Sequence, residues 1–223
     1  MIHDATRCAL GEGPLWHPER KTLYWFDILG KKLLTSGKHW QFDDYVSAAG
    51  WVDRDRMVMA SQHALWLFNL ETGTRDRLCD LEADNPVTRS NDGRADPQGG
   101  FWIGTMGIEA EEKAGAIYRY YRGTLRKLFG DLTITNAICF APVGKTAYFT
   151  DTTTAMIMKV DLDAEGWPVG APGLHIDLRG TGLNPDGAVV DAQGNLWNAQ
   201  WGASRVAAYR PDGNYLTHVS FAG

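Results

Sequence analysis

The sequence predicts an all-β propeller formed as one domain over residues 1–223, and three observations point to this fold class. The chain has 25 glycines and 9 tryptophans, the residue types of tight turns and aromatic strands. Short aromatic or β-branched runs recur throughout, and no stretch keeps a helical period of about 3.6 residues over three turns. Polar turns recur every 36 to 50 residues, which is the repeat length of propeller blades.

The repeats align on the turn between the first two strands of each unit. Residues 17–27 (HPERKTLYWFD) match residues 141–151 (APVGKTAYFTD) at Pro, Lys-Thr, Tyr and the final Asp. Residues 96–102 (DPQGGFW) and 191–197 (DAQGNLW) share the pattern Asp-x-Gln-Gly-x-x-Trp, and residues 53–57 (DRDRM) are a weaker copy. Each copy has the strand–turn–strand pattern of a hairpin. Five such copies predict about five blades within this chain.

One position of the repeat, five residues before each turn, predicts a shared site. Innermost propeller strands line the axis, so equivalent residues of these strands meet around it. Four of the five residues at this position carry side-chain oxygens, and only Ala48 does not; the four are Glu12, Asn91, Asn136 and Asp186. Asn and Asp before Gly are also typical of turns. Glu12 is not a turn former and Asn136 precedes Ala, so we favour a shared axial site.

Two carboxylates and two carboxamides, with no Cys or His at the same position, form a hard oxygen donor set. This set suits Ca²⁺, Mg²⁺ or Mn²⁺ better than a structural zinc, and a catalytic Zn²⁺ stays open. Asp92, next to Asn91, is a further acid that could support the site. Asp27 and Asp151 share a repeat position on the second strand, where we expect hydrogen bonding at the strand end rather than a place in the axial channel.

Composition argues against several partner classes. The net charge of −5 lacks the positive field that nucleic acid binding requires. No run of 18 apolar residues exists, so we expect no membrane span. Residues 1–4 lack secretory features and the three cysteines form no paired motif, so we expect a cytoplasmic protein with reduced thiols, either a monomer or a weak homo-oligomer.

An ordered set of short motifs along the chain resembles the SMP-30/gluconolactonase/luciferin-regenerating-enzyme family, which includes regucalcin and sugar lactonases. The motifs are residues 11–16 (GEGPLW), 89–93 (RSNDG), 104–106 (GTM), 115–118 (GAIY), 135–136 (TN), 185–187 (PDG) and 194–197 (GNLW). The resemblance implies a six-bladed propeller with one divalent metal on its axis. On this basis we expect the last blade to be missing from the chain.

The resemblance also implies a role for each site residue and a chemistry, the metal-dependent hydrolysis of a sugar lactone. The implied metal ligands are Glu12, Asn136 and Asp186, the implied proton acceptor and donor is Asp186, and the implied lactone contacts are Arg89, Asn91 and Glu109. The metal would polarise the lactone carbonyl and activate a water molecule. Two alternatives stay open, a calcium-binding propeller without catalysis and a propeller hydrolase for another lactone or ester.

Overall fold

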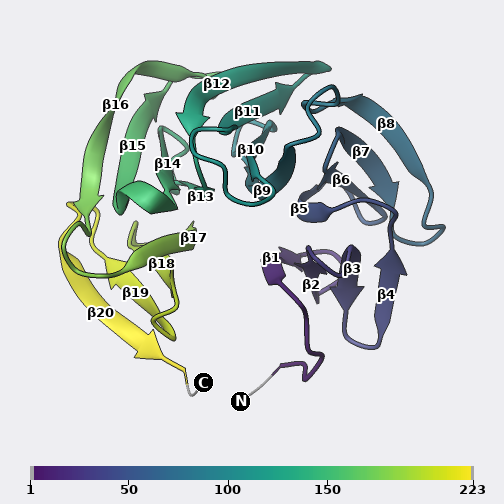
Figure 1. Ribbon diagram of the computed structural model, residues 1–223, viewed down its shortest axis with the longest axis horizontal. Coiled ribbons are helices and arrows are strands. Elements are labelled where there is room, and N and C mark those ends of the chain that lie inside the picture. Colours follow the sequence, from purple (N-terminus) through teal and green to yellow (C-terminus); the bar gives the residue numbers. More distant parts are fainter. Residues whose placement is uncertain (1–2, 222–223) are drawn as a thin grey trace.

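The computed structural model describes residues 3–221 as five four-stranded antiparallel sheets fanned around a common axis (Figure 1). Within each sheet the strands lie in sequence order, and the first strand of each lies nearest the axis. Inner strands of consecutive sheets contact one another from the first sheet to the fifth. These features confirm the predicted all-β propeller and place the repeat-equivalent residues of the five inner strands around one axis.

The sheets follow the five predicted repeats. The first contains β1 (Gly11–His17), β2 (Thr22–Asp27), β3 (Lys32–Thr35) and β4 (Lys38–Gln41). The second contains β5 (Val46–Trp51), β6 (Arg56–Ser61), β7 (Ala64–Asn69) and β8 (Arg75–Asp80). The third contains β9 (Thr88–Ala95), β10 (Phe101–Gly107), β11 (Gly115–Tyr121) and β12 (Thr124–Leu132). The fourth contains β13 (Thr135–Phe140), β14 (Thr146–Asp151), the 3₁₀ helix η1 (Thr152–Thr154), β15 (Met156–Leu162) and β16 (Pro168–Asp177). The fifth contains β17 (Asn184–Val190), β18 (Leu196–Trp201), β19 (Arg205–Tyr209) and β20 (Tyr215–Ser220).

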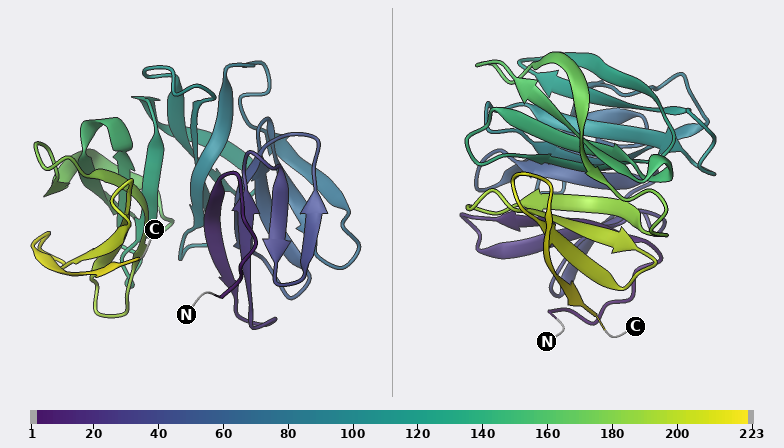
Figure 2. Two further views of the ribbon diagram at one scale, coloured as in Figure 1. Left: turned by 60° about the horizontal axis from the view of Figure 1, so that its bottom comes forward. Right: turned by 90° about the vertical axis from the view of Figure 1, so that its left-hand side faces the viewer.

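The expectation of six blades with the last one missing is wrong, because the structure is a five-bladed propeller. Each of the five repeated turns supplies one complete four-stranded sheet, and β20 already completes the fifth. The sixth blade was implied by the family resemblance and had no repeat of its own in the sequence. Both described ends of the chain lie on the same side of the molecule, between the first and the fifth sheets (Figures 1 and 2).

The repeated Asp-x-Gln-Gly pattern forms the turn between the first two strands of a sheet. In the third sheet, Oδ1 of Asp96 accepts hydrogen bonds from the amides two and four residues later, at 3.0 and 2.7 Å. In the fifth, Oδ1 of Asp191 makes the same two contacts, at 3.0 and 2.8 Å. Gly99 and Gly194 both have a φ of +85°, a left-handed conformation that glycine adopts without steric cost. The motif therefore fixes the hairpin that follows each inner strand.

The hydrophobic core is divided into clusters that lie between adjacent sheets. Phe26 and Leu33 of the first sheet pack with Met57 and Phe68 of the second. Three further clusters join the second sheet to the third, the third to the fourth, and the fourth to the fifth. Burial of these faces is the main stabilising term of the fold, and it holds the inner strands in fixed positions around the axis.

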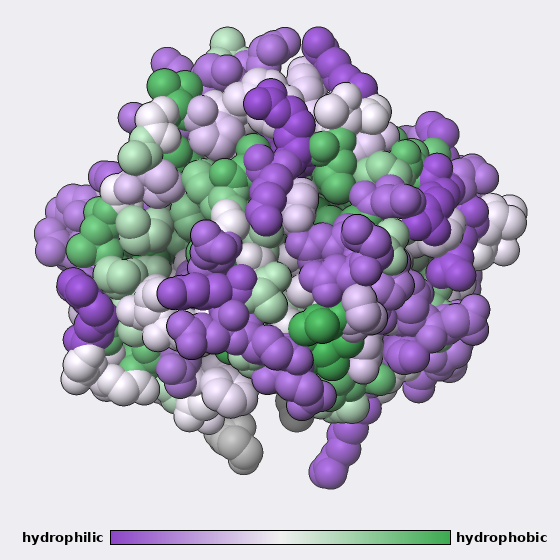
Figure 3. Space-filling model, turned by 45° about the horizontal axis from the view of Figure 1, so that its top comes forward, coloured by the Kyte–Doolittle hydropathy of each residue, from purple (hydrophilic) through white to green (hydrophobic). Residues whose placement is uncertain are grey.

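The surface is mainly polar on the face shown in Figure 3, where apolar side chains appear in small groups between hydrophilic ones. No helix among residues 3–221 has the length and apolar character needed to cross a membrane. All three cysteines are free.

Candidate active site

The residues at the repeat position five before each turn are called the axial residues below: Glu12, Ala48, Asn91, Asn136 and Asp186. Each inner strand departs from regular pairing close to its axial residue. The register with the second strand shifts after Glu12 in β1, after Asn136 in β13 and after Pro185 in β17. Similar shifts occur in the second and third sheets. A bulge of this kind twists the strand and changes the direction of its side chains. The same irregularity, repeated around the axis, allows these residues to point toward the centre.

The residue after the axial side chain shows what the bulge requires. Gly13 has a φ of +58°, and a Cβ atom placed on it would lie 2.4 Å from the carbonyl oxygen of Ser47 in β5. Only glycine fits this close approach of two inner strands. Ala137, which follows Asn136, is also left-handed, with a φ of +56°. A left-handed alanine is strained by about 1–3 kcal/mol, and such strain concentrates at functional sites.

Two aspartates hold the segments that lead into the axial residues. Oδ2 and Oδ1 of Asp27 accept hydrogen bonds from the amides of residues 9–10 at 3.1 and 3.0 Å. Oδ2 and Oδ1 of Asp151 accept them from the amides of residues 133–134 at 2.8 and 3.1 Å. These contacts confirm the predicted strand-end role of both residues. They also fix the backbone two or three residues before Glu12 and Asn136.

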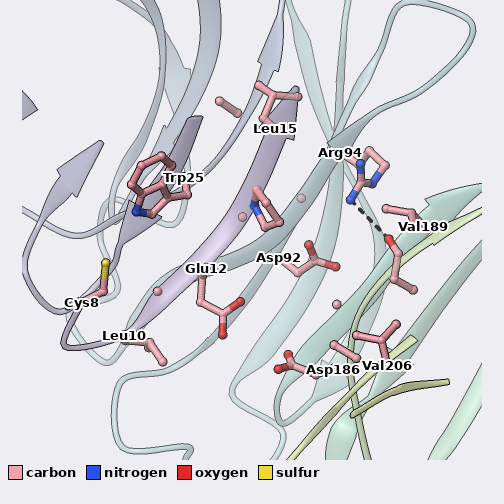
Figure 4. A pocket seen from close by; sticks show the side chains of 18 of the residues that line it. Cys8, Leu10, Glu12, Leu15, Trp25, Asp92, Arg94, Asp186, Val189 and Val206 are labelled. Atoms are coloured by element: carbon pink, nitrogen blue, oxygen red, sulfur yellow. Dashed lines mark hydrogen bonds between the residues drawn. The ribbon is translucent and has the colours of Figure 1, made fainter. Parts of the chain in front are cut away.

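A cavity of about 770 Å³ lies between the first and fifth sheets and reaches the inner strands; it is lined by residues of the segment before β1 and of β1, β2, β5, β9 and β17–β19. Glu12, Asp92 and Asp186 contribute three carboxylates to its wall (Figure 4). The remaining wall is largely apolar and includes Trp25 and Trp197. The cavity therefore combines a charged end with a largely apolar wall.

The carboxylates of this cavity repel one another in a partly dry setting. Burial, followed by the charges of Asp186 and Asp92, raises the pKa of Glu12 to about 8, and the Arg89 guanidinium opposes this shift. Burial and then the Asp92 charge raise the pKa of Asp186 to about 6. Burial also raises the pKa of Asp92. The excess of negative charge in so small a space is what a bound cation would neutralise.

A chain of hydrogen bonds joins three further predicted residues. Nη1 of Arg89, which is buried, donates to the carbonyl of Ser90 and to Oδ1 of Asn91, both at 2.9 Å. Nδ2 of Asn91 donates to the carbonyl of Thr135 at 2.8 Å and to Oδ1 of Asn136 at 3.3 Å. The structure thus connects the third inner strand to the fourth through the residues that the repeat singled out.

Glu109 stands apart from this arrangement. It lies exposed in the connection between β10 and β11, and its backbone amide donates to Oε2 of Glu111 at 3.1 Å. Like Arg89, Asn91 and Asn136, it is not among the residues that line the cavity, and no hydrogen bond links its side chain to those three. Its contact with a substrate remains a prediction.

Three residues that support the site were not predicted from the sequence. Nε of Arg94 donates to the carbonyl of Ile138 at 3.1 Å, while Oδ2 of Asp92 accepts from the Ile138 amide at 2.7 Å. Thr152 and Asn198 donate hydrogen bonds to backbone carbonyls of β17, the strand that carries Asp186. All three are single polar residues outside the repeat position, so the sequence offered no pattern that would identify them.

The oxygen donors of the site could hold a metal ion only as a mixed set of carboxylates and a carboxamide. No three His, Cys, Asp or Glu side chains between residues 3 and 221 form a cluster that could hold a metal ion by themselves. Glu12 and Asp186 supply two partly buried carboxylates, and a third ligand would have to be an amide oxygen, such as that of Asn136. This all-oxygen chemistry fits a hard divalent cation.

Comparison with known proteins places this arrangement in a family. Residues 10–223 match the family model described as "SMP-30/Gluconolactonase/LRE-like region". A relative from Rhizobium meliloti is 44% identical over 218 residues, which are 95% of this chain and 74% of its own. The L-arabinolactonase of Azospirillum brasilense is 35% identical over 219 residues, covering 93% of this chain and 72% of the relative.

A solved structure gives the same result. The calcium-binding protein regucalcin from Agrobacterium tumefaciens superposes with a TM-score of 0.94 at 41% identity, over 97% of this chain and 76% of that one. Sequence and fold agree over nearly the whole chain, so the protein belongs to the SMP-30/gluconolactonase/LRE-like family, as the motifs predicted.

Proposed function

We propose that this chain hydrolyses sugar lactones at the cavity between the first and fifth sheets, using one divalent cation (Ca²⁺, Zn²⁺, Mn²⁺ or Mg²⁺) held by Glu12, Asn136 and Asp186. The observation that carries the proposal is the pair of partly buried carboxylates, Glu12 and Asp186, that share one cavity and repel each other there. The lactonase named among the relatives supports the choice of substrate class.

The reaction breaks the bond between the carbonyl carbon and the ring oxygen of the lactone. A bound divalent cation supplies polarisation of the carbonyl and acidification of a water molecule. Asp186 takes the proton of the attacking water and returns it to the ring oxygen as this leaves, which requires a carboxylate beside the reacting atoms.

Substrate binding is assigned to Arg89, Asn91 and Glu109. The Arg89 guanidinium bonds only neutral oxygens through Nη1, so its remaining N–H groups can donate to sugar hydroxyls. Asn91 lies between Arg89 and Asn136 and would place a hydroxyl beside the reacting carbonyl. Glu109 would contact the substrate from the exposed β10–β11 connection.

The test measures acid release from D-glucono-δ-lactone above its spontaneous hydrolysis, first with chelator and then with each of the four cations. We expect activity that depends on the cation and is lost in Asp186→Asn. The matched control is Glu112→Gln, which removes an exposed carboxylate of the β10–β11 connection and should leave the rate unchanged. Hydrolysis that persists in chelator, or in Asp186→Asn, would contradict the proposal.

Calcium binding without turnover is the second candidate function, because the Agrobacterium structure is described as a calcium-binding protein. Saturable Ca²⁺ binding by a folded sample that hydrolyses no lactone would favour it. A hydrolase for a different lactone or ester would show cation-dependent turnover of that substrate alone. The cytoplasmic location, the monomeric or weakly oligomeric state and the absence of nucleic acid and membrane partners stay predictions.

A further inference from the structure

Thr152 makes a pair of hydrogen bonds that no catalytic step uses. It is the first residue of η1 and is 8% exposed. Its Oγ1 accepts a hydrogen bond from Nδ2 of Asn136 at 3.0 Å. The same hydroxyl donates to the carbonyl oxygen of Pro185 at 2.7 Å. One side chain therefore connects Asn136, the proposed metal ligand in β13, to the residue that precedes Asp186 in β17.

The two hydrogen bonds fix which end of the Asn136 carboxamide faces the axis. A threonine hydroxyl has one proton, and here the Pro185 carbonyl accepts it. Oγ1 can then only accept from its other neighbour, so the NH₂ group of Asn136 must face it. The reversed carboxamide would set two acceptors against each other in a buried position, which is costly. The oxygen of Asn136 is therefore directed away from Thr152, toward Nδ2 of Asn91.

Thr152 is itself held on both sides. Its amide donates to the carbonyl of Ile134 at 2.9 Å. Asp151 caps η1, because its Oδ1 accepts from the Thr153 amide at 3.1 Å, while Oδ2 accepts from the Thr133 amide. The hydroxyl is thus preorganised with respect to the strand that carries Asn136. Such support behind a metal ligand commonly determines its orientation.

We propose that Thr152 is a positioning residue, whose hydroxyl presents the carboxamide oxygen of Asn136 to a cation on the axis and ties β13 to β17 in front of Asp186. The cation-binding part of this role rests on the proposed function. The orientation of the carboxamide does not rest on that function, because it follows from the two hydrogen bonds of Thr152. It can therefore be measured in the absence of any cation.

The test compares three variants. Thr152→Val keeps the shape but removes both hydrogen bonds, and Thr152→Ser restores the hydroxyl. Thr150→Val is the matched control, because Thr150 is a buried threonine that pairs with Asn136 across the strands but whose hydroxyl donates to the Met156 carbonyl at 2.6 Å and not to Asn136. Calorimetric titration of the chelator-treated proteins with Mn²⁺ should show affinity about 10–100-fold weaker in Thr152→Val than in wild type. Thr152→Ser and Thr150→Val should bind close to the wild-type value.

A second readout uses the wild type without cation and does not depend on the folding of any variant. The side-chain amide protons of Asn136, observed by ¹⁵N NMR, should exchange slowly with water because Thr152 protects them. Fast exchange there, or Mn²⁺ affinity equal in Thr152→Val and Thr150→Val, would overturn the role. A wild type that binds Mn²⁺ but hydrolyses no lactone would refute the proposed function alone, while the comparison of affinities would still decide the role of Thr152.

Discussion

Replacing Glu12 by glutamine should make the metal-free protein more stable at alkaline pH. Burial and the charge of Asp186 raise the pKa of Glu12 from 4.5 to about 8. A carboxyl group whose pKa is higher in the folded than in the unfolded state favours folding below pH 4.5, and it loses that contribution as the pH rises through 8. Because each pKa unit corresponds to about 1.36 kcal/mol, ionisation of Glu12 costs the folded state on the order of 5 kcal/mol above pH 8.

Urea unfolding in chelator at a series of pH values would measure this cost. Wild type and Glu12→Gln should have similar free energies of unfolding below pH 4.5, and the variant should gain progressively as the pH approaches 8. Asp186→Asn should show its gain in a lower window, because the pKa of Asp186 is raised only from 3.8 to about 6. A difference between wild type and Glu12→Gln that does not change with pH would refute the reasoning.

A saturating cation should narrow the difference in stability between Glu12→Gln and wild type. A ligand that binds only the folded state stabilises it by about 2.7 kcal/mol at one hundred times its dissociation constant. Wild type should receive this gain from Mn²⁺ or Ca²⁺, whereas Glu12→Gln has lost a charged ligand and should receive less. Equal stabilisation of the two proteins by the cation would argue against Glu12 as a ligand.

Two further predictions concern stability, and urea unfolding would measure both. Gly13→Ala should lower the free energy of unfolding by about 2 kcal/mol or more, because a left-handed alanine alone costs about 1–2 kcal/mol and its Cβ would also meet a backbone carbonyl. Gly187→Ala is the control and should change the stability little, because a Cβ there meets no atom within 4 Å. Equal effects of the two substitutions would contradict the account of the bulge. Arg119→Met should cost about 3–5 kcal/mol, because it leaves Asp96, the partner in a fully buried ion pair, uncompensated. Arg179→Met breaks an exposed pair and should cost about 1 kcal/mol or less, so a similar loss in both variants would be the contrary result.

The turns carry most of what could be predicted from the sequence. In the Asp-x-Gln-Gly turns, the aspartate accepts hydrogen bonds from the following amides and the glycine adopts a left-handed φ. Because both roles are local, the spacing of these residues alone indicates where each sheet begins. Counting back from the turn then identifies the axial position, because side chains of equivalent residues share a direction. In this way Glu12 and Asp186 could be assigned to one site although 174 residues separate them in the chain, from 12 to 186.

The remaining features depend on contacts between sheets, which have no local signature. Thr152 acts on Pro185 in the next sheet, and Arg94 reaches the carbonyl of Ala188 at 3.3 Å from the third sheet to the fifth. Neither residue occupies a repeated position, so no periodicity indicates its partner. The blade count failed for a related reason, because it was taken from the family and not from the five turns that this sequence contains.

Asn198 shows how a departure from the repeat marks the site. It pairs with Ala188, the first regular pair after the bulge of β17, and the corresponding residues of the first and fourth sheets are Tyr24 and Tyr148. All three side chains are buried, but only Asn198 is an amide. A buried amide needs hydrogen-bond partners, and Nδ2 of Asn198 donates to the carbonyls of Asp186 and Gly187 at 2.9 and 3.2 Å. The second and third sheets have Ala60 and Ile103 at this position, so only the fifth sheet places an amide there, and this amide holds the bulge that carries Asp186. Packing alone would not require a donor against those two carbonyls, so the amide is better explained by the demands of the site than by those of the core.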